Sequence, residues 1–86
     1  MISEEAVRKK ILSYLEAERP LPCAAEEEKL SFEFLDSNFV DSIKIVELVT
    51  RLEEDFGVRF EPEDMQSVDF RTVKGMTGII LRLASR

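Results

Sequence analysis

The chain has 86 residues, 44% of them hydrophobic, and a formal net charge of −6, which suits one small domain but leaves no room for a deep catalytic cleft. It contains no histidine, no tryptophan and one cysteine, Cys23. Serine–histidine and cysteine–histidine catalysis, histidine metal sites and an intrachain disulfide are therefore excluded. We expect residues 1–86 to form a single domain that is not an enzyme, and that is a monomer in a reducing, cytoplasmic setting.

The ends of the chain and its charge pattern limit its partners. Residues 1–5 are acidic where a secretory signal would be basic, and the longest apolar run, Ile79–Leu81, is too short to span a bilayer. Residues 41–69 carry nine acids and three bases, whereas residues 70–86 carry four bases and no acid. Because acids repel phosphates, we expect a basic protein partner and no nucleic acid, unless the acids only keep the domain soluble.

The first predicted helix begins after a cap at Ser3 and runs to about Glu18, beyond which two prolines follow. Its apolar residues share an arc of about 100°, as in an amphipathic helix: Val7, Ile11, Tyr14 and Leu15. Residues 20–40 then form a long connection with an acidic run, Glu26–Lys29. Its apolar anchors are Leu30 and the group Phe32, Phe34 and Leu35. A connection of this length is expected to be functional, or else partly helical.

The second predicted helix, residues 42–56, has the clearest pattern. Asp41 is a good N-cap, which places Ser42 at the first helical position with an exposed hydroxyl. One narrow apolar stripe should face the core: Ile45, Leu48, Val49, Leu52 and Phe56. A second stripe, Ile43, Val46 and Thr50, lies elsewhere on the helix and is interleaved with acids: Glu47, Glu53 and Glu54. Either this second stripe is a docking surface for a basic partner, or Val46 flanks the core and Ile43 covers the preceding loop.

Two further helices complete the predicted fold. Gly57 ends the second helix, and Pro62 begins a short helix that reaches about Ser67. The last helix starts between residues 69 and 72 and reaches about residue 85, with one apolar face: Val73, Met76, Ile80, Leu83 and Ala84. Gly75 and Gly78 fall on its opposite face, where each costs roughly 1 kcal/mol relative to alanine if exposed. The sequence therefore predicts an all-α fold, a small four-helix bundle with three longer helices and one short helix.

The motifs around residue 42 resemble those of the acyl carrier proteins. The resemblance rests on Asp41-Ser42-Ile43, on Val46–Val49, on the helix end Leu52–Gly57 and on Phe60–Asp64, and it extends over the whole helix order. Ser42 as a hydrolase nucleophile would need a glycine-flanked elbow and a base, and the sequence has neither.

The resemblance implies a carrier function for the chain. Ser42 would receive 4′-phosphopantetheine from coenzyme A through a phosphopantetheinyl transferase and a magnesium ion, and Asp41 would cap the helix and help the transferase engage. The cofactor thiol would hold acyl or aminoacyl groups as thioesters for partner enzymes of fatty-acid or specialised-metabolite biosynthesis. Those ligases or synthases would have basic docking surfaces and would meet Ile43, Val46, Glu47 and Glu54.

Two departures bear on the cargo and the partners. Many fatty-acid carriers have glycine where this chain has Phe39, and an acid or glycine where it has Lys44. The run Leu35–Ser42 is more similar to stand-alone carriers of specialised pathways, including aminoacyl carriers of the D-alanine type, so the carried group stays open. The alternative function is an unmodified helical interaction module that uses the acidic-apolar face of the second helix.

Overall fold

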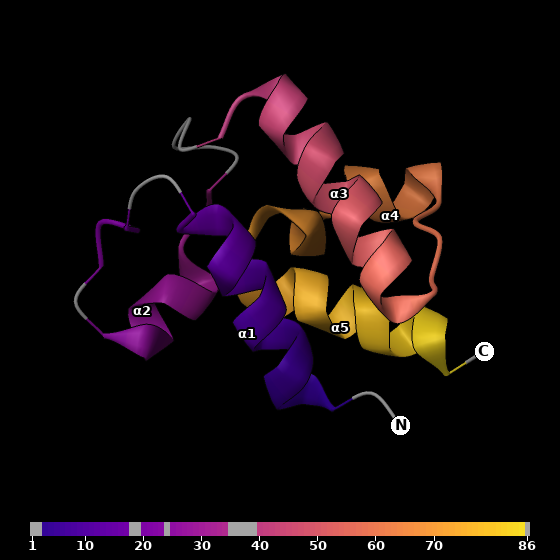
Figure 1. Cartoon of the computed structure of the whole chain (residues 1–86), viewed down its shortest axis with the longest axis horizontal. Coiled ribbons are helices and arrows are strands. Elements are labelled where there is room, and N and C mark those ends of the chain that lie inside the picture. Colours follow the sequence, from indigo (N-terminus) through magenta and orange to yellow (C-terminus); the bar gives the residue numbers. More distant parts are fainter. Residues whose placement is uncertain (1–2, 18–19, 24, 35–39, 86) are drawn as a thin grey trace.

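The computed structural model describes residues 3–17, 20–23, 25–34 and 40–85, and the regular structure of these residues is helical, without strands (Figure 1). The elements in chain order are α1 (Glu4–Leu15), α2 (Glu26–Ser31), α3 (Ser42–Phe56), α4 (Pro62–Gln66), the 3₁₀ helix η1 (Val68–Arg71) and α5 (Val73–Ala84). The predicted all-α fold with three longer helices is confirmed, and α2 and η1 are additional short helices. Within these described ranges, no helix is long and apolar enough to cross a membrane.

Helix α1 begins where the sequence predicts and ends earlier. The Ser3 hydroxyl accepts a hydrogen bond from the Ala6 N–H at 3.1 Å, as an N-cap does. The helix stops at Leu15 because the chain turns at Glu16, whose carboxylate accepts a hydrogen bond from the Leu21 N–H at 2.9 Å. This bond, followed by one from Lys29, lowers the pKa of Glu16. The predicted end at Glu18 lies outside the described residues.

The long connection is pinned to the bundle and contains a helix of its own. The acidic run forms α2, and Lys29 near its end forms an ion pair with Glu16 at 3.0 Å. Of the predicted anchors, Phe34 is fully buried and its N–H donates to the Arg71 carbonyl at 3.1 Å, while Leu30 and Phe32 are partly buried. Leu35 lies outside the described residues. The segment before α3 is therefore partly helical, one of the two expected outcomes.

Helix α3 has the predicted bounds and a defined end at each terminus. Asp41 caps its start, and Gly57 ends it in the left-handed conformation, at φ 62°, which glycine adopts without strain. On the core stripe Leu48, Val49 and Leu52 are buried, and the other two members are partly buried.

The segment after α3 packs a short helix and a 3₁₀ turn against α5. Pro62 opens α4, and the capping box of Glu61 and Asp64 satisfies backbone N–H groups at its start. Asp64 is also buried and forms an ion pair with Arg82 of α5. The Thr72 hydroxyl caps α5 by accepting from the Gly75 N–H at 3.0 Å.

Two expectations for α5 were wrong. Ala84 is exposed, whereas Thr77 and Ile79 join the buried face, because the helix packs on η1 and α2 as well as on α1. Gly75 does not lie on an open face: a Cβ there would lie 2.1 Å from the Asp69 carbonyl oxygen. Gly75 therefore allows η1 to approach α5 closely, and only Gly78, which has open space around it, matches the prediction of an exposed, weakening glycine.

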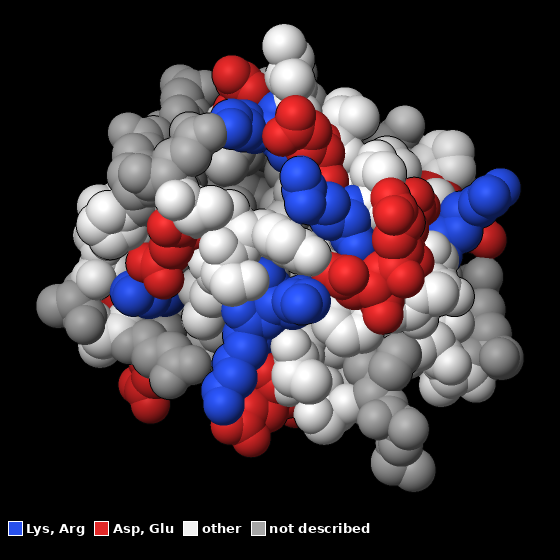
Figure 2. Space-filling view, viewed as in Figure 1, with Lys and Arg blue, Asp and Glu red and all other residues white. Residues whose placement is uncertain are grey.

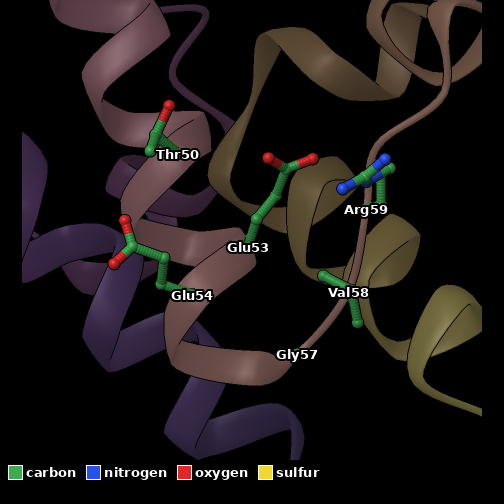
Figure 3. A pocket seen from close by; sticks show the side chains of 6 residues that line it. All are labelled: Thr50, Glu53, Glu54, Gly57, Val58 and Arg59. Atoms are coloured by element: carbon green, nitrogen blue, oxygen red, sulfur yellow. The ribbon is translucent and has the colours of Figure 1, made fainter.

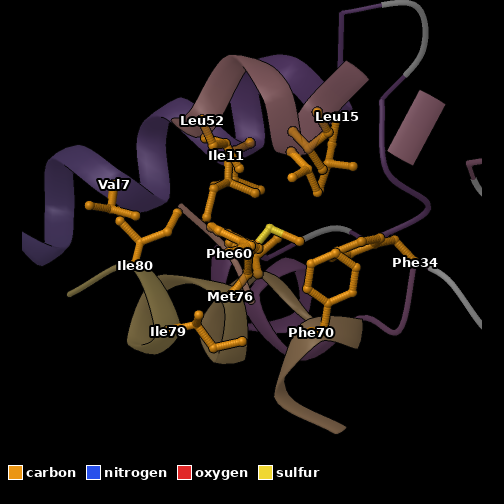
Figure 4. Packing of buried hydrophobic residues seen from close by; sticks show 14 of the residues in the cluster. Val7, Ile11, Leu15, Phe34, Leu52, Phe60, Phe70, Met76, Ile79 and Ile80 are labelled. Atoms are coloured by element: carbon orange, nitrogen blue, oxygen red, sulfur yellow. The ribbon is translucent and has the colours of Figure 1, made fainter. Parts of the chain in front are cut away.

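The core lies where α1, α3 and α5 meet. In Figure 4, Ile11 of α1, Leu52 of α3 and Met76 of α5 point toward one another, and all three are fully buried. The rings of Phe60 and Phe70 meet edge to face, 5.8 Å between centroids, and extend this core toward η1. Because α3 is held by one face only, its other face remains at the surface.

Candidate functional site

The start of α3 is built by Asp41. Its backbone is extended, and its carboxylate accepts a hydrogen bond from the Lys44 N–H at 2.8 Å, so the predicted cap is present. Its carbonyl accepts the first helical bond, from the Ile45 N–H at 3.0 Å. Ser42 is the first residue of α3, as predicted. The prediction that its hydroxyl is exposed lies outside the part of the chain that the structure describes.

The residues around this start lie at the surface. Asp41 and Lys44 are exposed, Ile43 is 70% exposed, and Val46, one turn further along α3, is 62% exposed. Glu47 and Glu54 are exposed as well. The structure therefore has the two predicted apolar stripes on α3, one buried and one exposed, and the reading in which Val46 flanks the core is wrong.

The acids of α3 divide into two groups. Glu53 is half-buried, and its carboxylate accepts a hydrogen bond from the Phe60 N–H at 2.7 Å, which holds the chain after Gly57 against the helix. Asp55 accepts a hydrogen bond from the Tyr14 hydroxyl of α1, and this bond raises the pKa of Tyr14. Glu53 was predicted to belong to the exposed acidic ring, and this prediction is wrong because its carboxylate binds the chain after the helix. The exposed acids of α3 are Glu47, Glu54 and Asp55, and of these Asp55 is bonded to α1.

Basic side chains lie among these acids. Arg51 of α3 stacks over the Tyr14 ring, with its guanidinium carbon 5.8 Å from the ring centroid, and the Lys10 Nζ is 5.9 Å from the same centroid. Figure 2 shows acidic and basic side chains next to one another across the face in view. The net acidity of residues 41–69 is therefore spread over a surface that also presents cations on α1 and α3.

A surface pocket of about 430 Å³ lies at the carboxyl-terminal half of α3 (Figure 3). It is lined by Thr50, Glu53, Glu54, Gly57, Val58 and Arg59. The turn at Gly57 carries Val58 and Arg59 back alongside the helix, so the pocket joins α3 to the segment that follows it. Arg59 was not predicted as a site residue, although its place two residues after a helix-ending glycine indicated that it lies near the end of α3.

Two further apolar residues are exposed although their exposure was not predicted. Met65 of α4 is 43% exposed and Val68 of η1 is 71% exposed. Both follow Pro62 in the short helical segment, where two turns are too few for a periodic pattern to separate a buried face from an exposed one.

The comparisons with known proteins identify the family. A family model described as the phosphopantetheine attachment site matches residues 23–80, a segment that includes α2, α3, α4, η1 and most of α5. The chain therefore belongs to the phosphopantetheine attachment-site family, in agreement with its resemblance to the acyl carrier proteins. No match was found among curated proteins or among solved structures. The predicted cofactor, covalently attached 4′-phosphopantetheine, is confirmed by this membership.

The start of α3 fits such a group. Asp41, Ile43 and Lys44 are exposed, so a long arm and the enzyme that attaches it have access to this part of the surface. The amino-terminal end of a helix of 15 residues would also favour the negative charge of a phosphodiester, because the helix dipole gives this end a partial positive charge.

Proposed function

We propose that Ser42 carries the 4′-phosphopantetheine arm and that residues 1–86 act as one carrier domain without catalytic activity of its own. The observation that carries this proposal is the position of Ser42, which begins α3 directly after the Asp41 cap and lies inside the matched segment 23–80. Because the Asp41 carboxylate already accepts the bond that a capping serine would accept, Ser42 is not needed as a cap.

Other described serines in the matched segment have structural roles. The Ser67 hydroxyl accepts a hydrogen bond from the Asp69 N–H at 3.0 Å and caps η1. The Ser31 hydroxyl donates to carbonyl groups of its own helix, α2, at 3.4 Å. Both hydroxyls therefore take part in the local structure of their own elements.

The carrier would work by position and recognition. When the arm is attached, its thiol supplies the chemistry by holding an acyl or aminoacyl group as a thioester. Asp41 orders the start of the helix, and the exposed residues Ile43, Val46, Glu47 and Glu54 form the surface that partner enzymes contact. The partners would be a phosphopantetheinyl transferase and acyl or aminoacyl ligases or synthases of fatty-acid or specialised-metabolite biosynthesis, in the cytoplasm.

Loading by a transferase tests the attachment residue. The wild type, Ser42→Ala and the control Ser67→Ala are incubated with a broad-specificity phosphopantetheinyl transferase, coenzyme A and magnesium, and intact masses are measured. We expect one added arm on the wild type and on Ser67→Ala, and none on Ser42→Ala. Loading of Ser42→Ala would disprove the assignment, and a wild type that several transferases leave unloaded would favour the unmodified interaction module.

Charge reversal tests the recognition surface. Glu47→Lys with Glu54→Lys should slow loading, and raising the salt concentration should reduce the advantage of the wild type, because exposed charges are screened over about 8 Å at physiological ionic strength. If the loading rate and its salt dependence are unchanged, these two acids only solvate the helix.

The carried group is tested separately. Intact-mass analysis of protein from the native host would identify the cargo from the thioester that the protein retains.

A further inference from the structure

The pocket at the end of α3 combines charges of opposite sign. Figure 3 shows Glu53 between Glu54 on one side and Arg59 on the other, all three bordering the same hollow. One carboxylate oxygen of Glu53 is already engaged by the Phe60 N–H, whereas Glu54 and Arg59 are exposed. In the part of the chain that the structure describes, the Arg59 guanidinium forms no ion pair. Its charge is therefore presented at the surface beside the acidic side of α3.

A uniformly basic partner fits this arrangement poorly. Lysine or arginine side chains that approach Glu47 and Glu54 gain attraction, but a further cation over the pocket meets Arg59 and is repelled. Like charges placed opposite one another select against a wrong partner, and opposite charges fix the orientation of the right one. Val58, a half-buried residue that lines the same pocket, adds an apolar contact for a side chain that enters it.

We propose that the partner seated on α3 presents an acidic side chain to Arg59 next to the basic side chains that pair with Glu47 and Glu54. This inference rests on the proposed carrier function and specifies the partner of the same surface. Arg59 then acts as a specificity residue: it weakens binding of surfaces that are basic throughout and strengthens binding of surfaces with mixed charge.

Selection of helical peptides tests the charge pattern directly, whichever enzyme the natural partner is. A displayed monomeric helix whose exposed face is varied among lysine, glutamate, alanine and leucine is selected on three proteins: the wild type, Arg59→Glu and Lys74→Glu. The last is a control with the same change of charge at an exposed residue of α5. We expect the wild type and Lys74→Glu to enrich helices that combine lysine with glutamate, and Arg59→Glu to replace that glutamate with lysine.

The affinity of a selected peptide for the wild type and for Arg59→Glu provides a second test. Exchanging its glutamate for lysine should weaken binding to the wild type roughly two- to fivefold, as expected for one exposed ion pair, and should strengthen binding to Arg59→Glu. The difference should vanish at about 1 M salt, where screening acts within about 3 Å. Three results would overturn the inference. The wild type and Arg59→Glu could both select helices with lysine only, or Lys74→Glu could change the selected residues as much as Arg59→Glu does. The third is that no helix is enriched on any of the proteins.

The outcomes separate this inference from the carrier proposal. The selection is repeated on Ser42→Ala, so that the charge pattern is measured independently of loading. A protein that is never loaded but selects mixed-charge helices would disprove the carrier function and leave the docking surface standing. A protein that is loaded at Ser42 but selects only lysine would disprove the role of Arg59 alone.

Discussion

The two apolar stripes of α3 consist of the same kinds of residue in opposite environments. Leu52 is fully buried between α1 and α5. On the same helix, Val46 is 62% exposed and Ile43 is 70% exposed. A buried aliphatic side chain contributes to stability through the water it no longer contacts, and an exposed one gains that contribution only when a partner covers it. The environment of a residue, more than its type, therefore decides whether it contributes to the fold or remains at the surface, where a partner could cover it.

Truncating the buried stripe should have the largest effect on stability. Leu52→Ala removes a fully buried side chain and leaves a cavity among packed neighbours, which should cost roughly 2–5 kcal/mol of unfolding free energy. Urea unfolding followed by circular dichroism measures this loss. The volume-conserving control Leu52→Met should cost less than about 1.5 kcal/mol. If Leu52→Ala is as mild as its control, the assignment of the core stripe is wrong.

This separation of stripes could be predicted because the pattern of α3 spans four turns of helix. The positions of Asp41, at its start, and Gly57, at its end, follow from local chemistry that needs no tertiary structure: a carboxylate cap and a left-handed glycine. The start of α3 at Ser42 and the exposure of Ile43 and Val46 could be predicted for the same reason.

Other features depend on contacts between distant segments, which a local pattern does not contain. After the end of α1, the Leu21 N–H donates a hydrogen bond to the Glu16 carboxylate across a turn. The need for glycine at residue 75 comes from the close approach of the η1 backbone. Arg59 lines a pocket with α3, and the segment that carries it is bonded to the helix where the Phe60 N–H donates to the Glu53 carboxylate. Acids that look equivalent in sequence therefore have different roles in the structure.

The two glycines of α5 extend the comparison to residues without side chains. In Gly75→Ala the new Cβ would lie 2.1 Å from the Asp69 carbonyl oxygen, so α5 and η1 must move apart, at a cost of about 1–3 kcal/mol. Gly78→Ala has open space and should stabilise the helix by up to about 1 kcal/mol. Thermal melts of both variants check the opposite signs. If the two variants shift in the same direction, the close approach of η1 is not a constraint on the fold.

Adjacent acids of α3 should differ in the same way. Glu53→Ala leaves the Phe60 N–H without its acceptor and should cost about 1–3 kcal/mol, while Glu54→Ala should stay within about ±0.5 kcal/mol. Chemical denaturation of the two variants makes a matched comparison, because each removes one carboxylate from neighbouring positions. Equal stabilities would mean that the bond from Phe60 to Glu53 contributes nothing to the end of α3.

The cap of α3 should contribute less than the core. Asp41→Ala removes the acceptor of the Lys44 N–H and should cost about 0.5–2 kcal/mol, whereas Asp41→Asn keeps a capping oxygen without the charge. If the charge of Asp41 also helps the transferase engage, Asp41→Asn should remain stable and still be loaded more slowly. Thermal melts combined with loading rates distinguish the two roles. An asparagine variant that is loaded at the wild-type rate would limit Asp41 to capping.

The exposed stripe should have the smallest effect on stability and yet a measurable effect on recognition. Ile43→Ala removes a side chain that is already 70% exposed, so little apolar surface returns to water and the stability should change by about 0.5 kcal/mol or less. A partner that covers Ile43 would bury that surface, and truncation should then weaken binding or slow loading by the transferase. Val46→Ala should have the same small effect on stability and the same effect on binding or loading. If Ile43→Ala destabilises the protein as much as Leu52→Ala and is loaded normally when folded, the second stripe belongs to the core.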